Sequence, residues 1–222
     1  MQFHAPEPVA TRIIAIRHGE TAWNVDTRIQ GQLDIGLNGH GRWQAEQAAL
    51  ALAHEAIDAV YTSDLLRAWA TAQALCERQH PKPPLHTVEG LRERAFGEFE
   101  GLTFKEIEAR LPEQALRWRK REPDFAPDGG ESLNAFRDRV VHTVTQLASA
   151  HPGQCIAIVA HGGVMDVLYR AATKLDLQAP RSWSLDNAAI NRLLFSRAGG
   201  LHLTGWNDVA HLQGDARDEA AA

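Results

Sequence analysis

The sequence predicts an α/β fold in which a mainly parallel sheet lies between two layers of helices. Two observations predict it. Short apolar segments, typical of buried strands, alternate along the 222 residues with longer segments of helical character. Strands buried on both faces are typical of parallel sheets, and strands that alternate with helices usually form such sheets. Together these observations indicate a three-layer sandwich with helices on both faces.

The expected elements follow one another along the chain. The strands cover residues 12–16, 59–62, 84–88, 155–160, 190–196 and 201–204, and Gly199-Gly200 separates the last two. The helices cover residues 39–54, 64–79, 104–121, 131–150 and 164–175. The helix at 131–150 is the clearest, because its apolar residues recur at helical spacing.

One domain spanning residues 1–222 is expected, because the chain has no internal repeat and no low-complexity linker. Residues 1–11 are polar and contain two prolines, and residues 213–222 lack an apolar stripe. Both ends are therefore expected to be flexible.

Composition excludes several classes of partner. The net charge is -5, whereas a nucleic-acid-binding protein usually carries a basic face. No apolar stretch approaches the ~20 residues that a membrane-spanning helix needs. The first residues do not combine a basic region with an apolar run, so no signal peptide is expected. We therefore expect a cytoplasmic protein that binds neither nucleic acid nor membrane.

Two histidines and two arginines follow the carboxyl ends of predicted strands. Arg17 and His18 come directly after the first strand, and His161 follows the strand at 155–160. Arg67 stands in the first turn of the helix after the strand at 59–62. In α/β sheets ligands bind beyond the carboxyl ends of the strands. We expect these four side chains to converge there if the strands are neighbours.

A cluster of two histidines and two arginines is well suited to binding a phosphate group. Guanidinium groups form two-pronged hydrogen bonds with oxyanions, and helix N-termini add partial positive charge. A metal site is the rival interpretation. It is disfavoured because Arg17 adjoins His18 and would repel a cation, and because the sequence has no His-Glu-x-x-His or paired-cysteine spacing. No metal or other cofactor is therefore expected, although each residue taken alone could be an ordinary turn or surface residue.

These residues stand in four segments that resemble the histidine phosphatase superfamily, which has the phosphoglycerate mutase-like fold. The resemblance covers residues 12 to about 170. In chain order the segments are Arg17-His18-Gly19-Glu20-Thr21 with Trp23-Asn24, Ser63-Asp64-Leu65-Leu66-Arg67-Ala68 with Thr71-Ala72, Leu91-Arg92-Glu93 with Gly97 and Glu100-Gly101, and His161-Gly162 after an apolar strand.

The resemblance implies a role for each matching residue. His18 would attack phosphorus and form a phosphohistidine, and Glu93 would be the general acid. The implied catalytic set is His18, Arg17, Arg67, Glu93 and His161. The implied phosphate- and substrate-binding set is Arg17, Asn24, Gln30, Gly31, Arg67, His161 and Gly162.

Physical reasoning supports these roles independently. Phosphoryl transfer requires positioning and charge stabilisation, and a nucleophilic nitrogen must be deprotonated. Neighbouring Arg17 and Arg67 should keep His18 neutral. The leaving oxygen needs a proton, which Glu93 can supply if the incoming phosphate keeps its carboxyl group protonated. Without the resemblance, Glu93 would be interpreted as part of a solvated, charged loop.

The leading hypothesis is a metal-independent phosphatase that hydrolyses small phosphorylated metabolites through a phosphohistidine. Alternatives are a mutase that uses the same intermediate and a non-catalytic module that binds phosphorylated ligands. Phe96 and the sequence His161-Gly162-Gly163 resemble the phosphatase branches, because the mutases carry Gly-Asn after this histidine. The combination of His18, Glu93 and His161 disfavours pure binding. The substrate, the role of residues 104–135 and the oligomeric state, a homodimer included, stay open.

Overall fold

The computed structural model describes residues 9–213. The ends predicted to be flexible lie outside this range, except for residues 9–11 and 213. Thr11 already belongs to the first strand, where its hydroxyl donates to the carbonyl oxygens of Ala148 and His151 at 2.7 and 2.9 Å. In the described part of the chain, no helix is long and apolar enough to cross a membrane.

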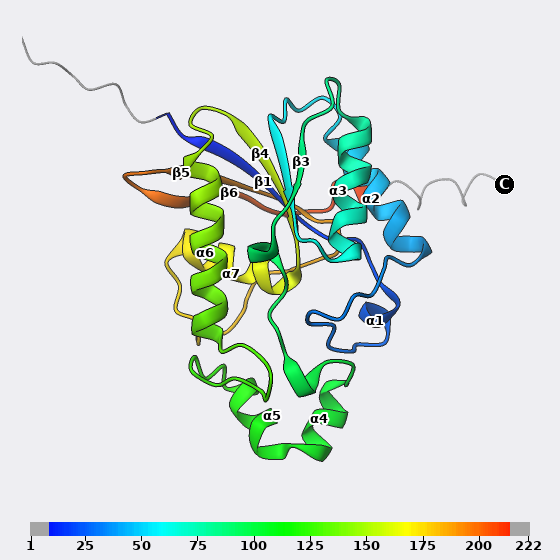
Figure 1. Ribbon diagram of the computed structural model, residues 1–222, viewed down its shortest axis with the longest axis vertical. Helices are drawn as coiled ribbons and strands as arrows, with labels where there is room; N and C mark the ends of the chain where they lie inside the picture. The colour runs from blue at the N-terminus through cyan, green and yellow to red at the C-terminus, as the bar shows by residue number, and fades with distance from the viewer. Residues whose placement is uncertain (1–8, 214–222) are drawn as a thin grey trace, which may run out of the picture.

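A mixed sheet forms the centre of the molecule (Figure 1). Its strands lie in the order β3-β2-β4-β1-β5-β6. Their bounds are β1 Thr11–Arg17, β2 Ala59–Thr62, β3 Leu85–Thr87, β4 Cys155–Ala160, β5 Ile190–Ser196 and β6 Gly200–Asp208. The four strands from β3 to β1 are parallel, while β5 and β6 run antiparallel at one edge. The sheet is therefore parallel where it supports the predicted site.

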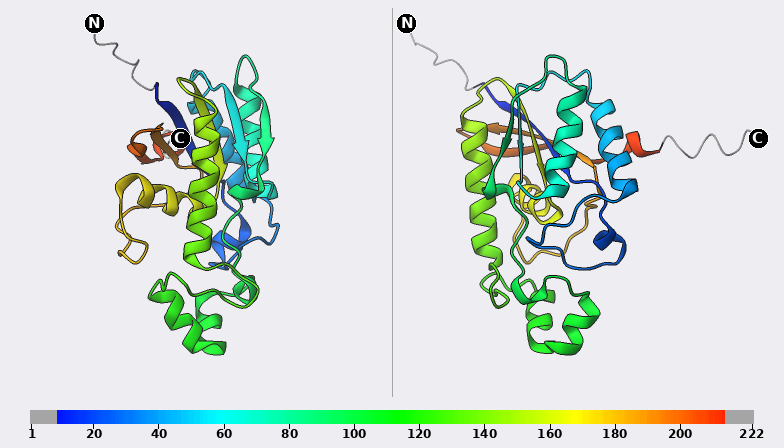
Figure 2. Two further views of the ribbon diagram at one scale, coloured as in Figure 1. Left: turned by 60° about the vertical axis from the view of Figure 1, so that its left-hand side comes forward. Right: turned by 45° about the vertical axis from the view of Figure 1, so that its right-hand side comes forward.

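Helices cover both faces of the sheet, as predicted (Figures 1 and 2). Their bounds are α1 Ala22–Val25, α2 Gly39–Ala51, α3 Leu66–Arg78, α4 Phe104–Arg110, α5 Pro112–Arg119, α6 Leu133–Ser149 and α7 Gly162–Thr173. Successive residues of β4 point to opposite faces. Ile156 and Ile158 pack in the core with α6 and α7, whereas Ala157 and Val159 pack in the core with α3 and with Leu52, the residue that follows α2. This alternation accounts for the continuous apolar sequence of the strand.

The prediction of one helix at 104–121 is wrong. Helix α4 ends at Arg110 and α5 begins at Pro112, with Leu111 outside helical geometry at φ -136° and ψ 59°. Proline lacks a backbone N–H and disfavours helical geometry in the residue before it, so it fits at a helix start but not inside one. The two short helices enclose a small separate core of Phe99, Ile107, Ala115 and Phe125, at the bottom of Figure 1.

Most of the other elements differ from the expected bounds by one to four residues, α6 and β6 among them. Helix α6 begins at Leu133 rather than at residue 131, because the hydroxyl of Ser132 caps it by accepting a hydrogen bond from the Ala135 N–H at 3.1 Å. Strand β6 extends to Asp208, four residues past the expected end, and its pairing with β5 contains register shifts. Neither difference moves the residues of the predicted site.

Candidate active site

Strand register brings the predicted site residues to one edge of the sheet. Arg17 pairs with Ala160 across β1 and β4, so the residues that follow, His18 and His161, lie side by side. The backbone N–H of His18 donates to the Ala160 carbonyl at 2.9 Å, and the centroids of the two imidazole rings are 5.2 Å apart. On the other side of β4, β2 ends at Thr62 opposite Val159, and α3 then begins with Leu66 and Arg67.

His18 is held in one tautomer. Its ring is buried, with 3% exposure, and Nδ1 lies 2.7 Å from the Gly19 carbonyl oxygen. A carbonyl can only accept, so Nδ1 carries the proton and the lone pair is on Nε2. Burial lowers the pKa of His18 well below its usual value, and the nearby charges of Arg67 and Arg17 lower it further. His18 is therefore neutral near pH 7, with Nε2 able to act as a nucleophile.

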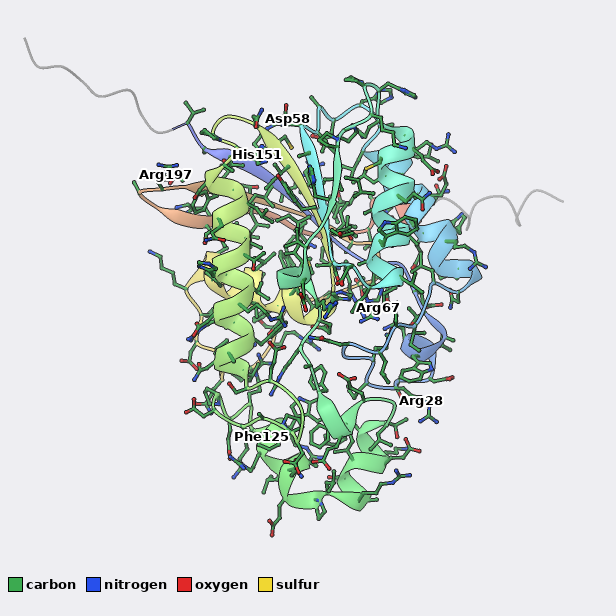
Figure 3. The ribbon with its side chains drawn as sticks, viewed as in Figure 1. Arg28, Asp58, Arg67, Phe125, His151 and Arg197 are labelled. Carbon is green, nitrogen blue, oxygen red and sulfur yellow. The ribbon has the colours of Figure 1, made fainter. Side chains whose placement is uncertain are left out.

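Some of the guanidinium nitrogens of Arg17 and Arg67 donate hydrogen bonds to backbone carbonyl oxygens. Arg67 donates from Nη2 to the Gly31 carbonyl at 2.7 Å and from Nη1 to the Leu33 carbonyl at 2.9 Å. Arg17 donates from Nη1 to the Leu185 carbonyl. The Nε atoms of both arginines are buried without a hydrogen-bond partner among residues 9–213. Figure 3 shows Arg67 below the carboxyl ends of the central strands.

His161 occupies the N-cap position of α7 without a capping hydrogen bond from its side chain, and it is fully buried. Both of its ring nitrogens lack a hydrogen-bond partner within the described part of the chain. Burial, followed by the charge of Arg67, lowers its pKa well below the usual value, so this ring is also neutral. Because buried polar groups are nearly always hydrogen-bonded, the unpaired nitrogens of Arg17, Arg67 and His161 together indicate a binding site for a ligand rich in acceptors.

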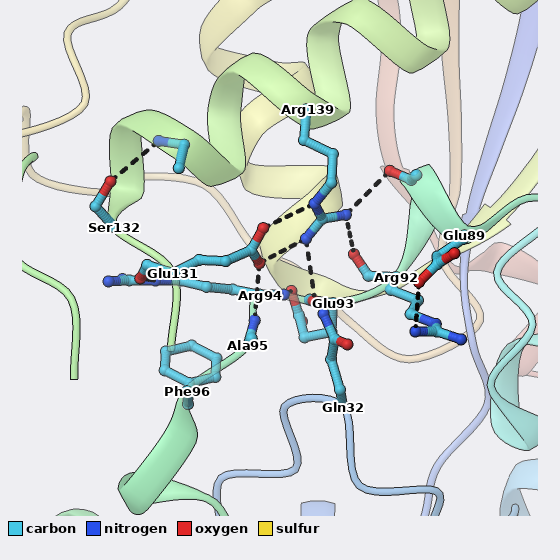
Figure 4. Close-up of polar contacts among 12 residues, drawn as sticks. Gln32, Glu89, Arg92, Glu93, Arg94, Ala95, Phe96, Glu131, Ser132 and Arg139 are labelled. Atoms are coloured by element: carbon cyan, nitrogen blue, oxygen red, sulfur yellow. Dashed lines mark hydrogen bonds and ion pairs between the residues drawn. The ribbon is translucent and has the colours of Figure 1, made fainter. Parts of the chain in front are cut away.

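Glu93 approaches the same edge from the loop after the 3-10 turn Glu89–Leu91. Its Oε2 accepts a hydrogen bond from the Gly163 N–H, in the first turn of α7, and its Oε1 accepts one from the Arg94 N–H, both at 2.9 Å. From α6, Arg139 donates to the carbonyl oxygens of Gly90, Arg92 and Glu93 at 3.0 to 3.3 Å (Figure 4). The backbone that carries Glu93 is therefore fixed at several points.

Asn24, Gln30 and Gly31 lie between β1 and α2, with Asn24 in the short helix α1 and the other two in the loop after it. The Asn24 Oδ1 accepts from the backbone N–H of Thr21 at 3.0 Å, which leaves its Nδ2 protons available to a ligand. The Gln30 Oε1 accepts from the Thr21 hydroxyl at 3.0 Å. Gly31 has φ +52°, and a Cβ there would lie 2.0 Å from Oε1 of Glu100, so the turn that presents its carbonyl to Arg67 requires glycine.

These residues line a cavity of about 220 Å³. The structure places eight of the nine predicted site residues on its wall, and the ninth, His161, lies against His18. The eight are Arg17, His18, Asn24, Gln30, Gly31, Arg67, Glu93 and Gly162.

Sequence reasoning missed two residues near this cavity. Arg28 lines it and pairs with Glu106 at 3.1 Å. The Asn187 Nδ2 donates to the His18 carbonyl oxygen at 2.9 Å and so fixes the backbone of that residue. Neither residue stands in a recognisable motif, and only the fold brings them to the site.

The arrangement can bind and transfer a phosphoryl group. Two arginines and a histidine can donate to the oxygens of a phosphate, while His18 offers a lone pair and Glu93 a carboxyl group. Within residues 9–213, no three histidine, cysteine, aspartate or glutamate side chains are grouped so that they could hold a metal ion. Charge on the phosphate would be balanced by the arginines.

Comparison with known proteins agrees with this geometry. The chain is 36% identical over 208 residues to a metal-independent phosphoserine phosphatase of Arabidopsis thaliana, covering 93% of this chain and 85% of the relative. It is 35% identical to phosphoglycerate mutase-like protein 4 of the same plant, over 96% of this chain and 91% of the relative. The structure resembles that of mycobacterial glucosyl-3-phosphoglycerate phosphatase, with a TM-score of 0.78 and 33% identity over 89% of this chain and 99% of that one.

A match to a family model shows which protein family the chain belongs to. The model for the histidine phosphatase superfamily (branch 1) matches residues 13–209, which include every residue of the site described above. The phosphatase-named relatives match over nearly the same length. The chain therefore belongs to branch 1 of the histidine phosphatase superfamily.

Proposed function

We propose that this phosphatase hydrolyses small phosphorylated metabolites through a phosphohistidine on Nε2 of His18, with no metal ion. The observation that carries the proposal is the group of buried, unpaired nitrogens near His18: Nε of Arg17, Nε of Arg67 and the two ring nitrogens of His161, one of which carries a proton in the neutral ring. A phosphoryl group supplies the several acceptor oxygens that such a group of donors needs.

In the first half of the proposed reaction, the lone pair on Nε2 of His18 attacks phosphorus. An N–P bond forms, and the bond between phosphorus and the ester oxygen breaks. The leaving oxygen takes a proton from the carboxyl group of Glu93, which becomes a carboxylate. Arg17, Arg67 and His161 stabilise the charge that spreads over the phosphoryl oxygens during the transfer.

In the second half, water replaces the alcohol. The Glu93 carboxylate removes a proton from water as its oxygen attacks phosphorus, and the N–P bond breaks. The electron pair returns to Nε2, so His18 is again neutral, with its Nδ1–H donating a hydrogen bond to the Gly19 carbonyl oxygen. Inorganic phosphate leaves and Glu93 is protonated, ready for another cycle.

Names of relatives support hydrolysis of phosphorylated small molecules. One relative is named for phosphoserine and another, from Mycobacterium tuberculosis, for glucosyl-3-phosphoglycerate. Both names describe phosphate esters of small molecules rather than of proteins or nucleic acids. We extend that class of substrate, and no single compound, to this chain.

Trapping the intermediate tests the proposal. After rapid quenching with a phosphorus-labelled ester, the wild-type protein should carry label that is stable to base and lost in acid, as a phosphoramidate is. His18→Ala should lose both the label and turnover. His54→Ala is the matched control, because His54 is exposed and distant in sequence from every site residue. Near-normal turnover in His18→Ala would show that the nucleophile is wrongly assigned.

Three expectations about the whole protein remain predictions. We propose a cytoplasmic enzyme that binds neither nucleic acid nor membrane, and we leave a homodimer open. Sedimentation of the full chain at several concentrations measures the oligomeric state directly. Fractionation of cells that express the chain tests its location.

A further inference from the structure

One peptide group in the chain between α7 and β5 holds the guanidinium of Arg17. This peptide joins Leu185 to Asp186, and its carbonyl oxygen accepts the hydrogen bond from Nη1 of Arg17. Among residues 9–213, Leu185 is the only hydrogen-bond partner of the Arg17 side chain. Residues 184–186 also line a second, larger cavity of the site, of about 650 Å³, which adjoins the first at Arg17. The direction of this one carbonyl therefore sets how the remaining guanidinium nitrogens face the site.

The other side of the same peptide is held by Asn207, in β6 at the edge of the sheet (Figure 1). The backbone N–H of Asp186 donates to Oδ1 of Asn207 at 2.9 Å, and Nδ2 of Asn207 donates in turn to Oδ2 of Asp186 at 2.6 Å. The peptide is trans, so it is planar and its N–H and C=O point in opposite directions. By fixing the N–H, Asn207 therefore also fixes the carbonyl that faces Arg17.

Asn207 is itself fixed to the sheet. Its backbone N–H donates to Oδ1 of Asn191, in β5, at 2.8 Å. Asn191 is buried, and its Nδ2 donates to the Ala15 carbonyl oxygen in β1 at 3.0 Å. Asn207 has φ +53°, in the left-handed region, which asparagine adopts more readily than most residues. Hydrogen bonds therefore run from the centre of the sheet, through Asn207, to the peptide that holds Arg17.

Trp206 fastens the neighbouring part of the same segment. Its Nε1 donates to the Ser184 carbonyl oxygen at 3.0 Å, and its ring meets that of Tyr169, in α7, edge to face with the centroids 4.9 Å apart. Trp183 stacks on Tyr169 with the centroids 4.0 Å apart. These contacts do not involve the Asn207 side chain, so its removal should release one peptide group and leave the rest of the segment in place.

We propose that Asn207 is a positioning residue for phosphoryl transfer. It orients the peptide between Leu185 and Asp186, and the carbonyl of that peptide aims the free guanidinium nitrogens of the site at the phosphoryl group. This inference rests on the proposed function. Asn207 lines neither cavity, so its effect on the reaction passes through Arg17. Hydrogen bonds in a chain polarise one another, so the Asn207 contact also strengthens the carbonyl as an acceptor.

Removal of the Asn207 side chain tests the proposal. Glycine suits the positive φ, so Asn207→Gly removes both contacts with Asp186 without straining the backbone. In folded protein, kcat/KM for p-nitrophenyl phosphate should fall by ~10-fold, the range for loss of one hydrogen bond on which the reaction depends. The unfolding temperature of the same preparation shows that the protein is folded. Equal kcat/KM in the variant and the wild type overturns the inference.

Asn134→Ala is the matched control. Nδ2 of Asn134 donates to Oδ1 of Asp124 at 2.7 Å, so this variant also breaks a contact between an asparagine and an aspartate. Neither residue lines a cavity of the site. The control should therefore leave kcat/KM unchanged.

A double-mutant cycle shows whether Asn207 acts through Arg17. In the Arg17→Lys protein the planar guanidinium that the Leu185 carbonyl orients is gone. Adding Asn207→Gly to that protein should therefore lower kcat/KM by less than about 2-fold, because the two residues act on one interaction. A full ~10-fold loss in that background would show that the two residues act independently, and overturns the inference.

An exchange of the two side chains tests the contact itself. Asn207→Asp alone places two carboxylates against each other and should lower kcat/KM by at least ~3-fold. Adding Asp186→Asn exchanges the amide and the carboxylate, so that both hydrogen bonds can form again and kcat/KM should return to within about 3-fold of the wild-type value. An exchanged pair that is no more active than Asn207→Asp overturns the inference, even if Asn207→Gly does not fold.

A binding measurement separates failure of this inference from failure of the proposed function. Calorimetry with inorganic phosphate needs no turnover, and Asn207→Gly should weaken phosphate binding by ~10-fold. Hydrolysis at the same kcat/KM in Asn207→Gly and wild type overturns the positioning role and leaves the phosphohistidine reaction standing. Weaker phosphate binding by the variant, with no wild-type hydrolysis of any ester, overturns the reaction and supports the positioning role. Equal binding with no hydrolysis overturns both.

Discussion

Replacing Arg17 by lysine is expected to lower kcat/KM by at least ~10²-fold while leaving the protein folded. Arg17 is the last residue of β1, and its Nη1 is held by the Leu185 carbonyl. Its Nε lies against Gly162, where an added Cβ would be only 3.3 Å away. This packing confines the plane of the guanidinium. Lysine keeps the positive charge but has a single ammonium group that cannot reproduce the planar fork.

The expected magnitude follows from the contacts that are lost. A hydrogen bond from a charged donor contributes about 1.5 to 3 kcal/mol, and about 1.4 kcal/mol corresponds to a factor of ten in rate. Loss of one or two such bonds to the phosphoryl oxygens in the transition state therefore lowers the rate by ~10²-fold or more. The assay is release of nitrophenolate from p-nitrophenyl phosphate, followed at several substrate concentrations to separate kcat from KM.

Arg12→Lys is the matched control for this prediction. Arg12 stands in the same strand, but its side chain is exposed and does not line either cavity of the site. Its replacement should leave both kcat and the unfolding temperature unchanged. A loss of only a few-fold in folded Arg17→Lys would mean that Arg17 does not touch the transferred group, and would refute the reasoning from the guanidinium geometry.

Three further predictions concern metals, pH and the reaction type. Exhaustive chelation should leave turnover unchanged, because Arg17 and Arg67 take the role of a metal; recovery only on adding Mg²⁺ or Zn²⁺ would contradict this. Since the pKa values of His18 and His161 are lowered in the folded state, the unfolded chain binds more protons, so the free energy of unfolding should fall as pH drops below about 6.5. Urea titrations should show up to about 1.4 kcal/mol lost per pH unit for each histidine, and the double variant His18→Asn/His161→Asn should flatten the curve. In a coupled assay supplied with 2,3-bisphosphoglycerate, interconversion of 3- and 2-phosphoglycerate should be negligible beside phosphate release by the same preparation; faster interconversion would identify a mutase.

The edge of the sheet that carries the site could be predicted because its residues follow strands directly. Continuous apolar sequence marked β1 and β4, and the motifs begin at the last residue of β1, Arg17, and at the residue after β4, His161. The pairing of Arg17 with Ala160 then places His18 beside His161. The local sequence predicts where these residues lie because the apolar composition of each strand shows where it ends. In α/β sheets the residues just beyond the carboxyl ends of the strands are the ones that bind ligands.

Other features could not be read from local patterns. The antiparallel pairing of β5 with β1 depends on where the chain re-enters the sheet after α7, and no residue pattern encodes that. Asn187 and Arg28 reach the site through tertiary contacts alone. The break between α4 and α5 could have been predicted from the sequence. Pro112 stands in the sequence, and a proline inside a helix generally interrupts it.

The lowered pKa values of His18 and His161 favour the chemistry of the site and reduce the stability of the fold at acidic pH. Burial makes a charge on either imidazole unfavourable, and the nearby charges of Arg67 and Arg17 add to this effect, so both rings stay neutral. A neutral His18 with its proton on Nδ1 is also the form that can attack phosphorus. The same unpaired nitrogens that make the ligand-free site unfavourable become hydrogen-bonded when a phosphoryl group enters. A phosphate ester should therefore raise the free energy of unfolding by an amount set by its concentration relative to its Kd for the folded protein, which urea titrations with and without the ester measure.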